Sequence, residues 1–239
     1  MNNPVMQRQA RRYEPYLDDP YRELNQALTG HLNRYGECLR GTKVLDFGCG
    51  ERPFESFFSR FSAQTVACDL QQNRFGTVDV VLTREASKLP FESGTFDVVC
   101  LFDVLEHVED DLALLAELRR ILKDGGLLLL SVPFMYRFHE IPHDYRRYTP
   151  TGLKYVLAKC GFDVQEVQPM GSAIFVADTV LRETTSKFLS RGARFARRLA
   201  MKMFLHLRNP DDPCSVSPFA FFAAARKQPE TQRLEVGCA

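Results

Sequence analysis

Two acidic residues and a pair of glycines form the segment with the clearest chemistry. Asp46 lies near the end of an apolar run, just before Gly48 and Gly50, and Asp69 ends the next apolar run. Glycines let the backbone approach a ligand closely and adopt positive φ. A carboxylate at the end of a second strand can accept hydrogen bonds from both hydroxyls of a ribose. This spacing predicts a site for a cofactor that contains a nucleoside.

The charge of this segment indicates which cofactor it suits. Pro53 stands where the third glycine of a dinucleotide-binding turn, G-x-G-x-x-G, would be. The Asp46 carboxylate would repel a pyrophosphate, whereas it suits the ammonium group of S-adenosylmethionine, which carries no phosphate. We therefore expect S-adenosylmethionine. A nicotinamide oxidoreductase and a plain strand–turn–helix without a ligand are the alternatives.

Methyl transfer from this cofactor is a displacement on a sulfonium carbon, in which alignment and exclusion of water supply much of the catalysis. An acceptor hydroxyl or carbon also benefits from a base, and we expect His107 or His143 to act as this base. A helix that begins here would put Asp103, Glu106 and His107 on one side. For Glu106 we favour a role in ordering the loop.

Polar residues gather after the fifth apolar run and predict an acceptor pocket. Arginines in this segment can bind a carboxylate or phosphate of the substrate. The structural alternative is that one arginine pairs with Asp144 and that Tyr148 packs against the sheet. The residues that we assign to substrate binding are His139, Tyr145, Arg146, Arg147 and Tyr148.

A divalent cation is the alternative to a histidine base. Asp103, Glu106 and His107, with His139 or His143, could form a cluster that holds such an ion. The ion would lower the pKa of an acceptor hydroxyl. We nevertheless expect no metal in this protein.

Strand-like runs alternate with helical patterns and must position these residues. The expected strands are Thr42–Phe47, Thr65–Asp69, Val78–Leu82, Phe96–Phe102, Leu127–Val132, Phe162–Val167 and Ser217–Ala225. The expected helices are Pro53–Phe61, Asp111–Leu122, and one from Thr149 or Thr151 to Cys160. Such alternation predicts a mostly parallel sheet covered by helices on both faces, with ligands at the carboxyl ends of its strands.

The segment from Lys43 to Phe134 resembles the class I S-adenosylmethionine-dependent methyltransferases, and within them the branch of ubiquinone-biosynthesis and glycan-cluster methyltransferases. The matching pieces, in the family's order, are VLDFGCG, CDL, LPFESGTFDVV, LFDVLEHVED and LRRILKDGGLLLLSVP. The resemblance implies an α/β, Rossmann-like fold with a seven-stranded, mostly parallel sheet whose last strand is antiparallel. It also implies that the cofactor is bound by Asp46, Gly48, Cys49, Gly50, Asp69, Leu70, Glu85, Ala86 and Phe102.

The composition suits one globular domain, with 239 residues of which 45% are hydrophobic and 26% charged. We expect a helical cap over residues 1–40, the methyltransferase domain over 41–228 with a basic helical insertion at about 176–210, and a loose tail over 229–239. No two of the seven cysteines are spaced as Cys-x-x-Cys, and the N-terminus has no apolar signal core. We therefore expect a cytoplasmic protein.

Residues 182–208 hold eight Lys or Arg residues and a single acid. A basic amphipathic helix can cover the active site as a lid, lie on an anionic membrane surface, or bind the phosphates of RNA. We favour the lid, with peripheral membrane contact as the second interpretation. Nucleic acid is the third, because no aromatic residues are interleaved on the basic stripe.

Together these patterns predict methyl transfer from S-adenosylmethionine to a small or lipid-linked acceptor, at oxygen. Two other functions remain as alternatives. An RNA methyltransferase would use the basic insertion to bind RNA, and a non-catalytic scaffold would bind S-adenosylmethionine without turnover.

Overall fold

A computed structural model of the chain describes residues 22–84, 88–171 and 218–229, together with single residues and short runs between 173 and 203. Most of the predicted basic insertion and nearly all of the predicted tail lie outside the described residues. The domain bounds given above therefore stay predictions. Within the described part of the chain, no helix is long and apolar enough to cross a membrane.

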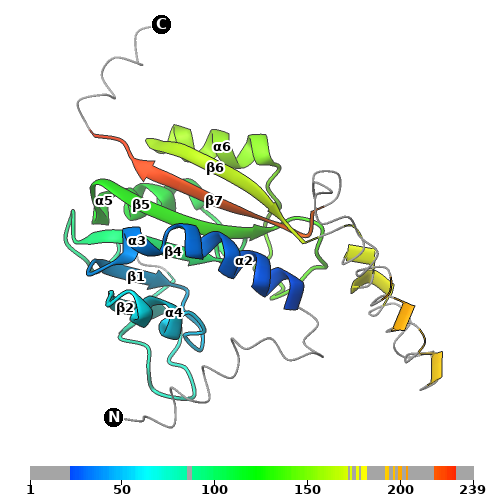
Figure 1. Cartoon of the computed structure of the whole chain (residues 1–239). Helices are drawn as coiled ribbons and strands as arrows, with labels where there is room; N and C mark the ends of the chain where they lie inside the picture. The colour runs from blue at the N-terminus through cyan, green and yellow to red at the C-terminus, as the bar shows by residue number, and fades with distance from the viewer. Residues whose placement is uncertain are drawn as a thin grey trace, which may run out of the picture.

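One sheet forms the centre of the molecule (Figure 1). Its strands are β1 Lys43–Phe47, β2 Gln64–Asp69, β3 Val80–Val81, β4 Phe96–Phe102, β5 Leu122–Pro133, β6 Phe162–Met170 and β7 Ala220–Lys227. The helices are α2 Arg22–Arg34, α3 Gly36–Leu39, α4 Glu55–Arg60, α5 Asp111–Ile121 and α6 Pro150–Lys159, with a 3₁₀ turn, η1, at Leu105–His107.

The strand order is β3-β2-β1-β4-β5-β7-β6. The first five strands pair in parallel, and β7 runs antiparallel to both β5 and β6. This confirms the predicted Rossmann-like sheet with its antiparallel last strand. The order reverses between β1 and β4, and ligands of such sheets bind outside the carboxyl ends of the strands at this point. The segments that follow β1, β2, β4 and β5 therefore meet at one edge.

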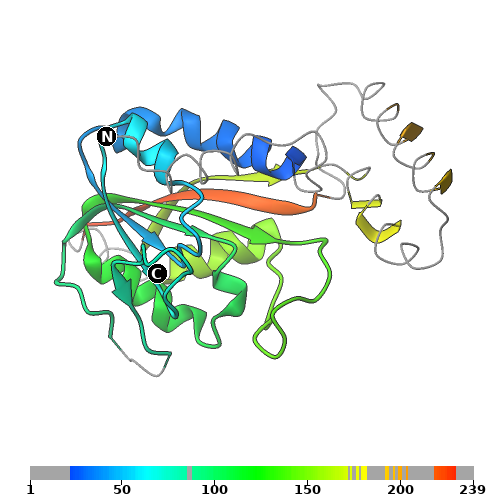
Figure 2. The ribbon, with the colours of Figure 1, turned by 90° about the horizontal axis from the view of Figure 1, so that it is seen from below.

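Both faces of the sheet are covered by helices (Figure 2). Side chains alternate along a strand, so that Val44 belongs to the core beneath α2, α3 and α4, whereas Leu45 belongs to the core beneath α5 and α6. Leu32 and Leu118, one from each layer of helices, are fully buried. Burying a leucine side chain contributes about 1.5–3 kcal/mol, so both faces hold the sheet in place.

The start of α6 and the end of α5 can be compared with the bounds that local sequence signals predicted. Thr149, rather than Thr151, caps α6, because its Oγ1 accepts a hydrogen bond from the Gly152 amide at 3.1 Å. The helix expected to reach Leu122 instead ends at Ile121, and β5 begins at Leu122, which pairs with Phe96. The helix therefore ends one residue earlier than predicted, because tertiary pairing with β4 begins at Leu122.

Candidate active site

The turn after β1 has a backbone conformation that favours glycine. Gly48 has φ of 69° and Gly50 has φ of 51°. A Cβ atom built on Gly48 would lie 2.3 Å from Val104 Cγ2, far inside van der Waals contact. The Gly48 and Cys49 amides both donate to the Cys68 carbonyl oxygen, at 2.9 and 3.1 Å. The turn is therefore fixed between the end of β2 and the segment after β4.

Asp46 presents a buried carboxylate to this turn. Only 3% of the residue is exposed, and its Oδ2 atom has no hydrogen-bond partner among the described residues. Burial raises the pKa of Asp46 to about 7, although the nearby Arg52 guanidinium opposes this shift. A buried carboxylate with an unused oxygen fits a cationic ligand group, such as the ammonium of S-adenosylmethionine.

Asp69 is held by the backbone on both sides. Its Oδ2 accepts from the Gly50 amide at 2.8 Å, and its Oδ1 accepts from the Leu70 amide at 2.6 Å. Each carboxylate oxygen keeps a further lone pair for a donor such as a ribose hydroxyl. The partly exposed carboxylate is therefore oriented before any ligand arrives.

The structure describes some of the other residues expected near the cofactor but not all of them. Phe102 ends β4, is half-buried, and packs against Phe54 with ring centroids 4.5 Å apart. Cys49 is buried within the turn, and Leu70 is exposed beside Asp69. Glu85 and Ala86 lie outside the described residues.

His107, His139 and Glu106 form a compact cluster where η1 meets the loop after β5. The two Nε2 atoms lie 3.0 Å apart, and Glu106 Oε1 lies 3.6 Å from His107 Nε2 and 3.8 Å from His139 Nε2. The Tyr145 amide donates to the Glu106 carbonyl oxygen at 2.9 Å and ties the loop to η1. Of the two histidines that the sequence offered as partners of His107, the structure therefore places the His139 ring in direct contact with it.

The partners of the rings indicate where protons lie. His107 Nδ1 is 2.7 Å from the His143 carbonyl oxygen, which only accepts, so this nitrogen carries the proton and Nε2 offers a lone pair. His139 Nδ1 lies 3.4 Å from Asp144 Oδ2 but makes no hydrogen bond among the described residues. The 3.0 Å contact between the two Nε2 atoms needs one donor, so His139 Nε2 donates to His107 Nε2 when both rings are neutral.

Glu106 is the most deeply buried member of this cluster. It is 0% exposed, and neither carboxyl oxygen has a hydrogen-bond partner among the described residues. Burial raises the pKa of Glu106 to about 9, and the charge of Asp103 adds to this shift. Burial and the charge of Asp103 therefore both favour the protonated form of Glu106.

This cluster also fits a divalent cation. One ligand atom each from Glu106, His107 and His139 lies within 4.8 Å of the others. The Nδ1 atom of His107 has an oxygen acceptor, as metal-binding histidines usually do, whereas that of His139 has no hydrogen-bond partner among the described residues. The four-residue set expected from the sequence is reduced to these three, since neither Asp103 nor the His143 ring joins them.

Asp103 is fixed separately. Its Oδ1 accepts from Ser131 Oγ at 2.7 Å, and its amide donates to the Ser131 carbonyl oxygen at 3.0 Å. Its φ of 52° lies in the left-handed region, which side chains rarely adopt. Removal of surrounding water raises the pKa of Asp103.

The expected acceptor pocket is divided between the cluster and a structural network. His139 belongs to the cluster, and Tyr145 is exposed. The Arg146 guanidinium pairs with Asp111 at 2.7 Å, and the buried Tyr148 hydroxyl donates to the same carboxylate. Arg146 and Tyr148 thus share Asp111 as a partner, and their assignment to substrate binding stays a prediction.

Arg147 and His143 also have protein partners. Arg147 makes a two-pronged contact with Asp144, which holds the pKa of that carboxyl well below its usual range. The His143 ring lies 3.2 Å from the Tyr145 hydroxyl, and only its backbone carbonyl reaches His107. The structure therefore does not bring the imidazole of His143 to that of His107.

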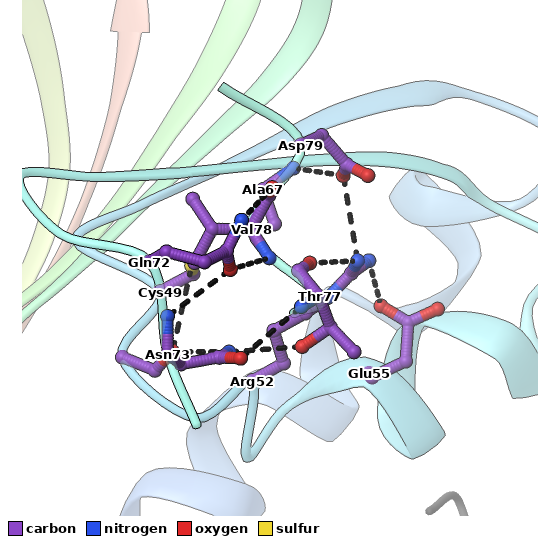
Figure 3. A network of polar contacts seen from close by, with 10 residues as sticks. Cys49, Arg52, Glu55, Ala67, Gln72, Asn73, Thr77, Val78 and Asp79 are labelled. Carbon is purple, nitrogen blue, oxygen red and sulfur yellow. Dashed lines mark hydrogen bonds and ion pairs between the residues drawn. The ribbon is translucent and has the colours of Figure 1, made fainter. Parts of the chain in front are cut away.

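Sequence reasoning missed a network beside the glycine turn, which Figure 3 shows. Arg52 Nη1 donates to the Thr77 carbonyl oxygen at 2.8 Å, and Nη2 pairs with Glu55 at 2.6 Å. Asn73 Nδ2 donates to the Gly50 carbonyl oxygen at 2.9 Å. The only sequence signal for this network was Asn73 followed by Gly76, which is typical of a turn.

Comparison with known proteins agrees with this geometry. A protein family described as "Methyltransferase domain" matches residues 20–167, more than half of the chain. A ubiquinone biosynthesis O-methyltransferase of Nitrosospira multiformis is 26% identical over 176 residues, which cover 62% of this chain and 73% of that protein. The protein of the same name from Xanthomonas oryzae pv. oryzae is 33% identical over 104 residues, which cover 39% of this chain and 44% of that protein.

A solved structure shares the fold. Phosphoethanolamine N-methyltransferase 2 of Haemonchus contortus, in complex with S-adenosyl-L-methionine, superposes with a TM-score of 0.56 at 20% identity. The match covers 85% of this chain and 53% of that one. The family match, the strand order and the cofactor-fitting turn lead to one conclusion. The chain belongs to the methyltransferase-domain family and is a class I S-adenosylmethionine-dependent methyltransferase.

Proposed function

We propose that this enzyme transfers the methyl group of S-adenosylmethionine to a hydroxyl oxygen of a small or lipid-linked acceptor. The observation that carries the proposal is the cluster of His107, His139 and Glu106 at the edge of the sheet where the glycine turn also lies. Hydroxyl acceptors need their proton removed, and an imidazole whose Nε2 carries a lone pair can take it. The relatives named ubiquinone biosynthesis O-methyltransferase support oxygen as the acceptor atom.

In this mechanism His107 Nε2 removes the acceptor proton while the acceptor oxygen attacks the methyl carbon. The bond from oxygen to carbon forms as the bond from sulfur to carbon breaks, and neutral S-adenosylhomocysteine leaves. The His143 carbonyl oxygen keeps His107 in the required tautomer. His139, 3.0 Å from the base, can share the proton taken up.

The same three side chains would hold a divalent ion in a second version of this mechanism. Such an ion, when bound, lowers the pKa of an acceptor hydroxyl. The unpartnered oxygens of Glu106 favour this version. The base version is supported if turnover is unchanged after the protein is treated with a chelator. Loss of turnover that Mg²⁺ or Mn²⁺ restores supports the ion.

The cofactor assignment is tested by calorimetric titration with S-adenosylmethionine. Replacing Asp69 by alanine removes the proposed acceptor for the ribose hydroxyls, and we expect Kd to rise at least about tenfold. Asp163→Ala, an exposed carboxylate on β6, is the matched control and should leave Kd unchanged. Absence of binding by folded wild type would remove the basis of the proposal, whereas binding without turnover on any acceptor would favour a scaffold.

The proposed acceptor class includes lipid-linked molecules because two regions could meet a membrane. Residues 182–208 carry eight basic residues, although they lie mostly outside the described residues. Phe138 and Ile141, in the loop after β5, are 78% and 75% exposed. Exposed apolar side chains combined with basic charge suit an anionic lipid surface.

Vesicle sedimentation tests this membrane contact. We expect binding to vesicles that contain phosphatidylglycerol and little binding to pure phosphatidylcholine, because the attraction depends on charge. The double variant Phe138→Ser, Ile141→Ser should bind less, whereas Tyr155→Ser, exposed on α6, should not. Equal recovery with both vesicle types would contradict the proposal, and retention of RNA that salt abolishes would favour the RNA alternative.

A further inference from the structure

The connection between β2 and β3 is unusually short. These strands pair in parallel, with Cys68 opposite Val80 and Asp69 opposite Val81. Parallel neighbours usually require a crossover of a dozen or more residues that contains a helix. Here only residues 70–79 join them, and this described segment contains no helix. Other groups must therefore hold the connection in place.

Two neighbouring amide side chains close this loop. Gln72 Oε1 accepts from the Val78 amide at 2.9 Å, and its Nε2 donates to the Val78 carbonyl oxygen at 3.0 Å, so the side chain pairs as a strand would. Asn73 Oδ1 accepts from the amides of Phe75 and Thr77 at 3.0 and 3.1 Å. The turn is thus built by side-chain oxygens.

Asn73 also reaches the cofactor turn. Its Nδ2 donates to the Gly50 carbonyl oxygen at 2.9 Å and to Thr77 Oγ1 at 2.8 Å (Figure 3). The Gly50 amide in turn donates to Asp69 Oδ2 at 2.8 Å. Gly50 is therefore held at its amide by Asp69 and at its carbonyl by Asn73, in a conformation with φ of 51°.

Arg52 anchors the far end of the loop. It donates to the Thr77 carbonyl oxygen and pairs with Glu55 at the start of α4. A third contact, at 3.4 Å, reaches Asp79, whose Oδ2 accepts from the Ala67 amide in β2. Both ends of the loop are therefore fixed to elements that flank the glycine turn. The loop is thus held in place where Asn73 contacts Gly50.

We infer that Asn73 is a positioning residue that sets the affinity for the cofactor by holding Gly50, and through Gly50 the carboxylate of Asp69. The inference rests on the assignment of Asp69 to the ribose. Asn73 has no contact with the His107 cluster among the described residues, so its loss should weaken cofactor binding and spare the chemical step.

The test compares two swaps of an amide for a carboxylate at adjacent positions. Asn73→Asp keeps the oxygen that accepts from Phe75 and Thr77 but cannot donate to Gly50. Gln72→Glu adds the same charge one residue away, keeps the acceptor for Val78, and does not touch the glycine turn. The measurements are calorimetric Kd for S-adenosylhomocysteine, kcat and KM for S-adenosylmethionine, and melting temperature.

We expect Asn73→Asp to raise Kd and KM about tenfold with kcat nearly unchanged, and Gln72→Glu to stay within about twofold of wild type. Equal affinities for wild type and Asn73→Asp would overturn the inference, as would equal losses in both variants that follow their melting temperatures. If Asn73→Asp does not fold, Asn73→Ser, which is too short to reach Gly50, carries the same expectation. Failure of wild type itself to bind would instead count against the cofactor assignment.

Discussion

Replacing His107 by asparagine should lower kcat by about 10²–10⁴-fold, the range over which positioned general bases act. The substitution removes the Nε2 lone pair that faces His139 and the proposed acceptor. It should leave the affinity for S-adenosylmethionine close to that of wild type, because Asp46 and Asp69, which we propose as the residues that bind this ligand, lie on β1 and β2. Single-turnover kinetics with saturating cofactor measures the effect on the chemical step directly.

His143→Asn is the matched control for this variant. Among the described residues its ring bonds to Tyr145 alone, whereas the carbonyl oxygen that orients His107 belongs to the backbone and remains. We expect kcat to change by less than about threefold, because no group of the cluster is lost. An equal loss in both variants would move the base role toward His143 and contradict the assignment made here.

The affinity for S-adenosylmethionine should fall as the pH drops below about 7, the pKa that burial gives Asp46. The ammonium group of the ligand stabilises the ionised carboxylate of Asp46. Binding at pH 6 must therefore release the proton of the Asp46 carboxyl into solution. Calorimetry in two buffers with different enthalpies of ionisation counts that proton. Asp46→Asn should remove both the pH dependence and the proton release, and raise Kd at pH 8 about 10²-fold.

The stability of the ligand-free protein should respond in the opposite direction. A carboxyl whose pKa is higher in the folded state contributes most to stability below its unfolded pKa, and this contribution is lost as the pH rises through about 7. Asp46→Asn should therefore raise the melting temperature of the free protein at pH 8 while weakening its binding. Asp97→Asn, paired with Lys123 at the start of β4, serves as the control for loss of a carboxylate. If the Kd of wild type for S-adenosylmethionine does not change with pH, the assignment of Asp46 to the ligand's ammonium group is contradicted.

The fold and the cofactor edge could be predicted from the sequence because their signals are local. Apolar runs fix the strands, and the positions of Asp46, Gly48 and Asp69 follow from where those runs end. The contacts of the loop after β5 could not be predicted in this way. His139 and His143 lie four residues apart, and only the path of the loop determines which ring meets His107.

The same limit applies to the charged residues of that loop. Arg146 and Tyr148 both contact Asp111. Asp111 begins α5, which precedes β5 in the sequence, whereas the loop follows β5. The sequence indicated that the arginines of this loop could bind an anion, but no periodic pattern in the sequence connects Arg146 or Tyr148 with Asp111. Asn73 escaped notice for the same reason, because its partner Gly50 precedes it by a whole strand.

The contact between Gly48 and Val104 has a consequence for anyone who wishes to redesign this enzyme. Gly48 has no room for a side chain because Val104 already fills the space, so a change at either position affects the other. A larger residue at position 104, chosen to reshape the acceptor pocket, would push on the cofactor turn. Libraries that alter acceptor choice should therefore keep Val104 unchanged.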